Sequence, residues 1–282
     1  MYKVNCKPTV SVIMPVYNAG EFIVEAIESI LNQTYKNFEF IIVDDGSTDN
    51  SWQIIQKFQK RHPRLIKTYR LNKQTNYAGN GATNHGLKFA KGEFIVRMDA
   101  DDIAHPQRLE KQVTFMIKNP DVILLGTQAN LIDRLGKKIG KKIVPITHKK
   151  IYEEYGIVHP IIHPTCMFRR SLLPDPNKIY ANKYGVNSDY YSFFYLLNYG
   201  KFANLPEFLL NYRIHANNFS LKYPKKKFIN SLKIRYAAIT RFGYKITLKA
   251  FCLTLIQALI VGLIPERLIV PLYLRIRAVS GL

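Results

Sequence analysis

The stretch Arg97-Met98-Asp99-Ala100-Asp101-Asp102 places three carboxylates directly after the apolar run Glu93-Phe94-Ile95-Val96. Such a run favours a buried strand, and three acids at its end are costly unless a positive group is held there. The commonest occupant of an oxygen-only site with few protein ligands is a divalent cation that bridges to substrate phosphates. A second acidic cluster, Val43-Asp44-Asp45-Gly46-Ser47, closes the apolar run of residues 38–43. Two acidic strand ends predict a ligand crevice at the carboxyl edge of an α/β sheet.

Strand-like and helix-like segments alternate through the first half of the chain. Strands are expected at residues 9–14, 38–43, 65–70, 93–98 and 122–125, with helices at 19–33, 51–59, 81–90 and from Pro106. This alternation predicts an α/β fold with a mostly parallel, doubly wound sheet flanked by helices. Further along, the sequence predicts a loop or hairpin at 137–150, a loop leading into a strand at 159–170 and an aromatic helix at 188–199.

The length and composition of the chain suit one large domain with an appendage. The chain has 282 residues, of which 47% are hydrophobic, so a substantial core is expected. We expect a catalytic domain over residues 1–220, with halves at 1–127 and 128–220, and a basic, apolar helical tail over 221–282. The three cysteines lack metal or redox spacing, which suits a reducing compartment. The polar N-terminus does not resemble a signal peptide.

The positive charge is concentrated toward the C-terminus. The formal net charge is +21, and residues 201–282 hold 14 Lys/Arg against 2 acids, a net of +12. This excess predicts an anionic partner, either a membrane surface or a nucleic acid, and the alternative is a solvated basic face. Residues 250–264 carry no charge and follow Lys245 and Lys249. The uncharged segment is shorter than the roughly 20 residues of a spanning helix, so it predicts a helix lying in the membrane interface. The alternative is a buried or dimer-forming helix.

Six motifs occur in a fixed order over residues 9–127. They are Val12-Ile13-Met14-Pro15-Val16-Tyr17-Asn18, Ser29-Ile30-Leu31-Asn32-Gln33-Thr34-Tyr35, Val43-Asp44-Asp45-Gly46-Ser47-Thr48-Asp49, Asn84-His85-Gly86-Leu87, Gly92-Glu93-Phe94-Ile95 and Asp99-Ala100-Asp101-Asp102. Together they resemble the motifs of the family 2 glycosyltransferases, which have the GT-A fold. The resemblance is dense over these residues and thinner to about residue 220.

The resemblance implies roles for residues of the donor site. Tyr17 matches the position that stacks on the nucleotide base, and Asp45 matches the carboxylate that bonds the base edge, usually uracil. Asp99 and Asp101 match the D-x-D pair, of which the first contacts the ribose or donor sugar and the second binds Mn²⁺ or Mg²⁺. Asp102 is the usual neighbour that orients the loop. As alternatives, Tyr17 is a core aromatic, one of the paired acids at 44 and 45 caps the following turn, and Asp102 caps the next segment.

Asp189 matches the general base of the family, within Asn187-Ser188-Asp189-Tyr190-Tyr191. Many members have a Glu before this Asp, whereas this chain has Ser188. A carboxylate at the start of a helix is stabilised as the anion, so it stays ionised and acts late, as the acceptor hydroxyl becomes acidic. The alternative is that Ser188 or Asp189 is a plain N-cap.

Two other segments resemble family motifs. Tyr212-Arg213-Ile214-His215 resembles a Tyr-Arg-x-His motif near the end of the catalytic domain. The resemblance implies that Arg213 binds the donor diphosphate and that His215 reaches the metal, and the alternative is a surface loop without a role. His163 and Arg169 resemble residues that border the acceptor pocket. The family often has Arg where this chain has Thr83, so Lys73, Lys88 or Arg97 is expected to replace its phosphate contact.

These features predict a metal-dependent, inverting hexosyl- or N-acetylhexosaminyl-transferase, peripheral on the cytoplasmic face of the membrane. It would move a sugar from a nucleotide-sugar donor, UDP-linked by preference, to a hydroxyl of a membrane-associated glycan or lipid-linked acceptor. Breaking the sugar–diphosphate bond leaves a concentrated negative charge, which Mn²⁺ or Mg²⁺ stabilises. The C-terminal region would contact the membrane surface, and no nucleic acid partner is expected.

Three other functions are open to such a chain. A basic nucleic-acid-binding protein fits the charge, but no binding motif supports it. A non-catalytic nucleotide-sugar-binding module would be indicated by loss of Asp101 or Asp189, and both are present. A nucleotidyltransferase usually has a Gly-rich, cation-bearing loop after the first strand, and the stretch at 17–20 lacks the cation.

Overall fold

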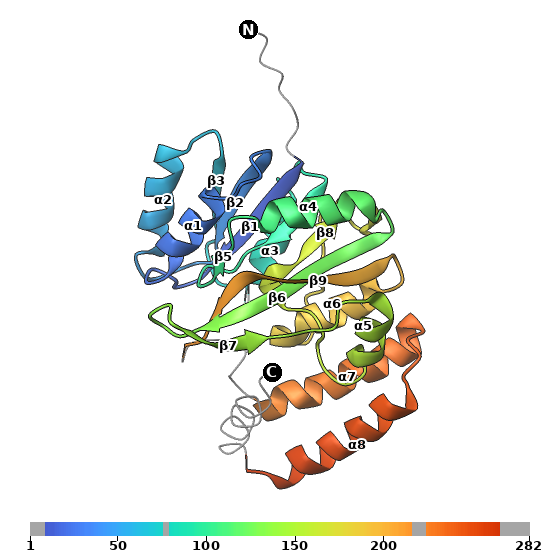
Figure 1. Ribbon diagram of the computed structural model, residues 1–282. Helices are drawn as coiled ribbons and strands as arrows, with labels where there is room; N and C mark the ends of the chain where they lie inside the picture. Colours follow the sequence, from blue (N-terminus) through green and yellow to red (C-terminus); the bar gives the residue numbers. More distant parts are fainter. Residues whose placement is uncertain (1–8, 76–78, 216–223, 266–282) are drawn as a thin grey trace.

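A nine-stranded mixed sheet forms the centre of the molecule (Figure 1). The computed structural model describes residues 9–75, 79–215 and 224–265. The strand order is β3-β2-β1-β4-β8-β6-β9-β5, and β7 pairs with β6 outside this path. The strands are β1 (Val10–Val16), β2 (Phe38–Asp44), β3 (Ile66–Arg70), β4 (Phe94–Arg97), β5 (Ile103–Ala104), β6 (Val122–Ile132), β7 (Lys138–Lys142), β8 (Met167–Arg169) and β9 (Lys201–Arg213). The helices are α1 (Ile23–Leu31), α2 (Ser51–Arg61), α3 (Asn80–Leu87), α4 (Arg108–Lys118), α5 (His148–Tyr155), α6 (Ser188–Leu196), α7 (Pro224–Phe242) and α8 (Leu248–Leu263).

The first four strands of the sheet order run parallel. β1 pairs with β2 and with β4, and β2 pairs with β3, all in parallel register. Every residue of β1, β2 and β4 is buried. Parallel strands are covered by helices on both faces, so they need continuous apolar sequence rather than alternation. This explains why the apolar runs alone were sufficient to predict these strands.

Helices cover both faces of the sheet, as the doubly wound prediction requires. On one face, apolar residues of α1, α2 and α4 form one core with alternate residues of the sheet, among them Val12 and Phe40. On the other face, apolar residues of α3, α5 and α6 form a second core with Ile13 and Ile41. The α/β fold class predicted from the sequence is confirmed.

The second half of the sheet is mixed in direction. β8 is antiparallel to β4 and β6, β9 is parallel to β6, and β5 is antiparallel to β9. The sequence predicted that the strand beginning at Val122 ends at residue 125, but β6 continues to Ile132. Polar residues 127 and 128 interrupt the apolar run, so the sequence pattern did not predict this continuation. Both are buried and hydrogen-bonded, Thr127 to Thr165 and Gln128 to the backbone of Val144.

α7 and α8 lie together at one end of the molecule, beyond α5 and α6 (Figure 1). α7 packs on α6 through buried Ile234 and Ala238. Helical structure in the predicted tail is confirmed as far as residue 265, and the apolar segment at 268–274 lies outside the described residues. In the part of the chain that the structure describes, no helix combines the length and apolar character needed to cross a membrane.

Adjacent residues on α4 provide a matched test of this packing. Met116 is fully buried against the sheet, whereas Ile117 is 65% exposed. We expect Met116→Ala to lower the free energy of unfolding by about 2–5 kcal/mol, because it leaves a cavity. Ile117→Ala should stay within about 0.5 kcal/mol of the parent protein. Urea unfolding followed by circular dichroism measures both, and equal losses would contradict the assigned face of α4.

Candidate active site

The acidic strand ends meet at one edge of the parallel sheet. The backbone N–H of Asp45 donates to the carbonyl of Val16 at 2.7 Å, so the residues that follow β1 and β2 lie together. The N–H of Met98 donates to the carbonyl of Ile13 at 3.1 Å, which brings the end of β4 to the same edge. Tyr17, the next residue after β1, is 37% exposed there. The predicted crevice edge is therefore formed by three neighbouring strands.

The two acids after β2 have different roles. Asp44 forms an ion pair with Arg70 at 3.1 Å and accepts the N–H of Ser47, so it is the one that closes the turn. Asp45 is buried, and its two oxygens accept the N–H and hydroxyl of Thr75 at 3.0 and 2.9 Å. Burial raises the pKa of Asp45, against the effect of these hydrogen bonds. Each Asp45 oxygen keeps a lone pair for a further donor.

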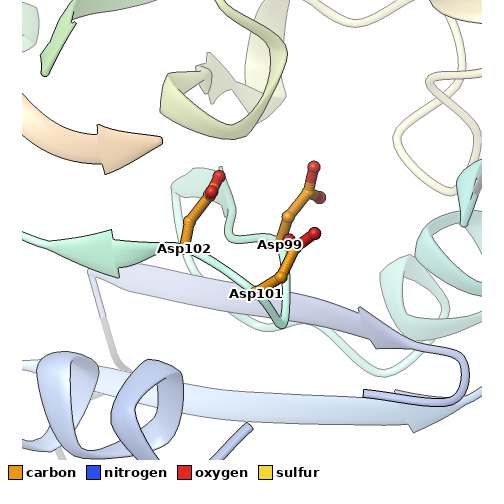
Figure 2. Close-up of side chains that lie close together, drawn as sticks. All are labelled: Asp99, Asp101 and Asp102. Atoms are coloured by element: carbon orange, nitrogen blue, oxygen red, sulfur yellow. The ribbon is translucent and has the colours of Figure 1, made fainter. Parts of the chain in front are cut away.

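Asp99, Asp101 and Asp102 form what we call the acid turn, between β4 and β5 (Figure 2). One carboxylate oxygen from each residue lies within 4.8 Å of the others. The Asp99 carboxylate accepts the Nε–H of Arg97 at 2.8 Å, and Asp101 Oδ2 lies 3.0 Å from His215 Nε2. Asp102 is buried rather than capping the next segment. Its Oδ1 accepts the backbone N–H of Arg213 at 2.9 Å, and its Oδ2 has no hydrogen-bond partner among the described residues.

The electrostatics of the acid turn suit a hard cation. Burial raises the pKa of Asp99, and it raises the pKa of Asp102 well above the usual range, with the neighbouring carboxylates adding to the effect on both. The cluster therefore opposes its own ionisation, and a divalent cation would relieve this. Carboxylate oxygens are the ligands that Mn²⁺ and Mg²⁺ prefer. The unpartnered Oδ2 of Asp102 adds to the fit.

Arg213 is buried in the wall behind the acid turn. The side chain is 2% exposed, and its Nε–H donates to the carbonyl of Asp101 at 2.8 Å. Its other nitrogens donate to the carbonyl of Arg134 and the carboxylate of Glu25, and the guanidinium lies over the ring of Phe22. The sequence prediction had Arg213 binding the donor diphosphate. The structure instead places its guanidinium among protein groups.

The pairing of β5 with β9 explains how residue 213 reaches the acid turn. Ile103 and Ala104 pair with Asn211 and Leu210, so β9 ends beside the turn that precedes β5. His215 follows directly, and its ring packs on Phe22 with centroids 4.9 Å apart. Arg213 and His215 of the Tyr-Arg-x-His motif therefore both lie beside the acid turn.

A buried hydrogen-bond network joins the acid turn to α6. Arg97 donates to Asp99 and also to Asn80 Oδ1 at 3.0 Å and Thr83 Oγ1 at 2.8 Å. Asn80 in turn donates to Ser188 Oγ at 2.7 Å. Arg97 thus donates to Thr83, which stands where the family often has Arg. Ser188, which stands where many members have Glu, fixes the start of α6.

Asp189 lies in the first turn of α6 and is 17% exposed. The N-cap position is Asn187, so neither Ser188 nor Asp189 occupies it. Asp189 Oδ2 lies 3.4 Å from His159 Nε2 and 3.7 Å from His163 Nδ1. The second nitrogen of His159 accepts the N–H of Ile161 at 3.4 Å, which leaves the proton on the nitrogen that faces Asp189.

Asp189 is held as an anion despite its burial. Burial on its own raises the pKa of the carboxyl, but the neighbouring rings of His159 and His163 and the N–H of Tyr190 outweigh it, so the pKa is below its usual value. Burial lowers the pKa of His163 well below its usual range, so this ring is neutral at pH 7. Lys227 of α7 also faces Asp189, and burial lowers the pKa of the lysine to about 8.

Several residues of the site were not identified from the sequence. Glu25, His159 and Lys227 lie in segments without a motif, and only the tertiary fold brings them to Arg213 or Asp189. Arg169 was predicted to border the acceptor pocket, but it is buried and donates to the carbonyl of Val122 at 3.3 Å. That contact ties it to the first residue of β6. His163 remains near Asp189 and accepts from or donates to Tyr180 at 2.8 Å.

Comparison with known proteins identifies relatives of this chain. The sequence model described as glycosyl transferase family 2 matches residues 11–175. The O-antigen biosynthesis glycosyltransferase WbnJ of Escherichia coli is 36% identical over 214 residues, which are 73% of this chain and 80% of WbnJ.

Solved structures share the fold at low sequence identity. Staphylococcus aureus TarS 1-349 in complex with UDP-GlcNAc superposes with a TM-score of 0.65 at 20% identity, over 83% of this chain and 67% of that one. The mannosyltransferase PcManGT from Pyrobaculum calidifontis, in complex with GDP-Man and Mn²⁺, has a TM-score of 0.60 at 17% identity, over 98% and 87% of the two chains.

Two arginines that pair with neighbouring acids test the role of the wall behind the acid turn. Arg213 pairs with Glu25 in the buried wall, whereas Arg134 pairs with Glu21 and is 67% exposed. We expect Arg213→Ala to lower the free energy of unfolding by more than about 2 kcal/mol, because buried carbonyls lose their donor. Arg134→Ala should have little effect. Thermal unfolding without ligand compares them, and unchanged stability of Arg213→Ala would contradict its role in supporting the acid turn.

Proposed function

The chain belongs to glycosyl transferase family 2 and is therefore a glycosyltransferase, and we propose that it is a metal-dependent, inverting enzyme with a nucleotide-sugar donor. The observation that carries the proposal is the buried link from Asp99 through Arg97 and Asn80 to Ser188. This link fixes an acidic, cation-fitting turn and a carboxylate base at the two sides of one site. Chemistry that moves a sugar from a diphosphate leaving group to an acceptor hydroxyl requires both.

The donor lies along the edge formed by β1, β2 and β4. Tyr17 stacks on the base from its exposed position, and Asp45 accepts a hydrogen bond from the base edge. Asp99 would face the ribose or donor sugar, and Asp101 and Asp102, with His215 beside them, would hold Mn²⁺ or Mg²⁺. A bound divalent cation would neutralise the charge that develops on the departing diphosphate. The uridine preference rests on family resemblance and on the UDP-GlcNAc complex of TarS.

The acceptor hydroxyl is deprotonated by Asp189. Its lowered pKa keeps it ionised, so it accepts the proton as the oxygen attacks the anomeric carbon and the bond to the diphosphate breaks. One in-line displacement of this kind inverts the configuration at that carbon. His159 Nε2 lies 3.4 Å from Oδ2 of Asp189, so its contact is with that oxygen and Oδ1 is left for the acceptor. His159 is thus a positioning residue for the base.

Arg213 is reassigned from donor binding to holding the acid turn. Its guanidinium bonds the carbonyl of Asp101, and its backbone bonds Asp102. Both contacts fix the direction of the acid turn, so that Asp101 faces the donor without a side-chain rearrangement. Preorganisation of this kind is what makes a charged site effective in a transition state.

The acceptor class is inferred from the relatives. The name of WbnJ assigns that protein to O-antigen biosynthesis, a process that builds a glycan. We infer a hexosyl or N-acetylhexosaminyl transfer to a hydroxyl of a membrane-associated glycan or a lipid-linked carrier. A screen of nucleotide sugars for thermal stabilisation, with and without Mn²⁺, identifies the donor because ligand binding raises the melting temperature by mass action.

The acid turn predicts metal-dependent donor binding. Asp101→Asn should abolish the rise in melting temperature that a nucleotide sugar gives with Mn²⁺, because one charged ligand is lost. Asp121→Asn, which removes an acid paired with Lys201 on the surface, should keep the full rise. Stabilisation of Asp101→Asn equal to that of the parent protein would reject the metal assignment.

The base predicts a loss of transfer without a loss of donor affinity. Asp189→Asn should reduce kcat by roughly 10²–10⁴-fold with donor binding unchanged. His159→Ala should reduce kcat by roughly ten- to a hundred-fold, because the contact that positions Asp189 Oδ2 is lost, and His159→Gln should recover part of it. The pH profile should show no fall due to Asp189 above about pH 4, since its pKa is lowered. Loss of donor binding in Asp189→Asn would make the residue structural.

A further inference from the structure

α8 presents a long apolar face to solvent. Seven large apolar side chains of this helix are between 47% and 83% exposed. They are Leu248, Phe251, Leu255, Ile256, Leu259, Ile260 and Leu263. Successive turns of the helix contribute one or two of them each, at spacings of three or four residues between turns, so they lie along one side of the helix, which we call the α8 apolar face. Scattered apolar residues are normal on a surface, but a contiguous row marks an interaction site.

The opposite side of α8 is attached to the catalytic domain. Ala250 is fully buried, and a Cβ on Gly156 would approach it to 2.9 Å. Thr254 donates to the carbonyl of Gly156 at 3.2 Å and accepts from Arg235 of α7 at 3.0 Å. Arg235 also donates to the hydroxyl of Tyr190, next to Asp189. The apolar face is therefore held outward by fixed contacts on the inner side.

The surface of α7 beside it is cationic and aromatic. The exposed residues of α7 include Lys226, Ile229, Lys233 and Tyr236, again at helical spacing. A hollow of ≈ 410 Å³ beside α7 is lined by Tyr184, Leu232, Lys233, Tyr236, Ala237 and Arg241. Between Glu207 and Glu266 the sequence contains ten Lys or Arg and no acid. The exposed lysines of α7 thus complement an anionic surface.

We propose that the α7–α8 pair docks on an anionic lipid bilayer, with the α8 apolar face in the interface and the α7 lysines on the headgroups. α8 has 16 residues, which is shorter than a spanning helix, so it lies in the plane of the membrane. Apolar insertion and cation attraction together give the two signals that stable peripheral binding needs. A second copy of the chain would cover the apolar face but would leave the cations unexplained.

The orientation follows from contacts within the fold. α7 carries Lys227, which faces Asp189, and Arg235, which bonds Tyr190 of α6. The helix on the membrane is therefore the same helix that borders the proposed base. An acceptor anchored in the bilayer reaches Asp189 along α7, which extends the proposed function by naming the surface that delivers the acceptor.

Vesicle cosedimentation of the full chain without donor tests the proposal. The parent protein should bind vesicles of phosphatidylglycerol mixed with phosphatidylcholine, bind phosphatidylcholine alone far more weakly, and dissociate as salt is raised. Leu255→Gln combined with Leu259→Gln should abolish most of this binding. Ile117→Gln removes an equally exposed apolar residue from α4 and should leave it unchanged.

Charge-matched variants test the second half of the proposal. Lys226→Gln combined with Lys233→Gln should weaken binding to anionic vesicles by about five-fold per lysine. Lys57→Gln combined with Lys60→Gln makes the same charge change on α2 and should have little effect. Circular dichroism checks that each variant is folded. Because no donor is used, the outcome is independent of the proposed reaction.

Three outcomes would overturn the proposal. Absence of vesicle binding by the parent protein is the first. Unchanged binding of the α8 double variant is the second, since it would assign membrane contact to another part of the chain. The third is a parent protein that does not bind vesicles and is a dimer in light scattering, while the α8 double variant is a monomer. This result would make the α8 apolar face a contact between copies.

Discussion

The short antiparallel pairing of β5 with the end of β9 is the constraint on which the acid turn depends. β5 has only two residues, yet its partner delivers both Arg213 and His215 to the preceding turn. The backbone N–H of residue 213 bonds Asp102, and its guanidinium bonds the carbonyl of Asp101. Three acids within four residues would otherwise repel one another and turn toward water. Here the buried guanidinium of Arg213 lies behind the acid turn and fixes which of the carboxylates face the crevice.

A second arginine, Arg97, fixes the acid turn from its other side. Arg97 is buried and binds Asp99, and its remaining donors bond Asn80 and Thr83. Because Asn80 also bonds Ser188, the separation between the D-x-D pair and α6 is set by protein groups and does not depend on a ligand. The sequence departures at positions 83 and 188 are connected through this one network. A small hydroxyl at each position leaves room for the guanidinium and the amide between them.

The parallel half of the fold could be predicted from the sequence because its strands are buried on both faces. Continuous apolar runs and acidic ends at Asp45 and Asp99 were sufficient. The mixed half was harder, because β6 carries buried polar residues whose partners are distant in the sequence. The family resemblance pointed to Asp189, Arg213 and His215. It could not show that the side chain of Arg213 is buried behind the acid turn. His159 has no motif, and only the packing of the loop before β8 against α6 brings it to the base.

The ion pair between Arg213 and Glu25 joins residues 188 positions apart. The acid turn is therefore not a local structure, although its sequence is one of the shortest motifs in the chain. During synthesis, residues 97–102 leave the ribosome long before Arg213. The acid turn therefore cannot form its buried contacts until the end of β9 has been made. The match to the family model stops at residue 175, before Asp189, Arg213 and His215. A fragment cut at that boundary would retain all three acids of the turn and lose the groups that make them a site.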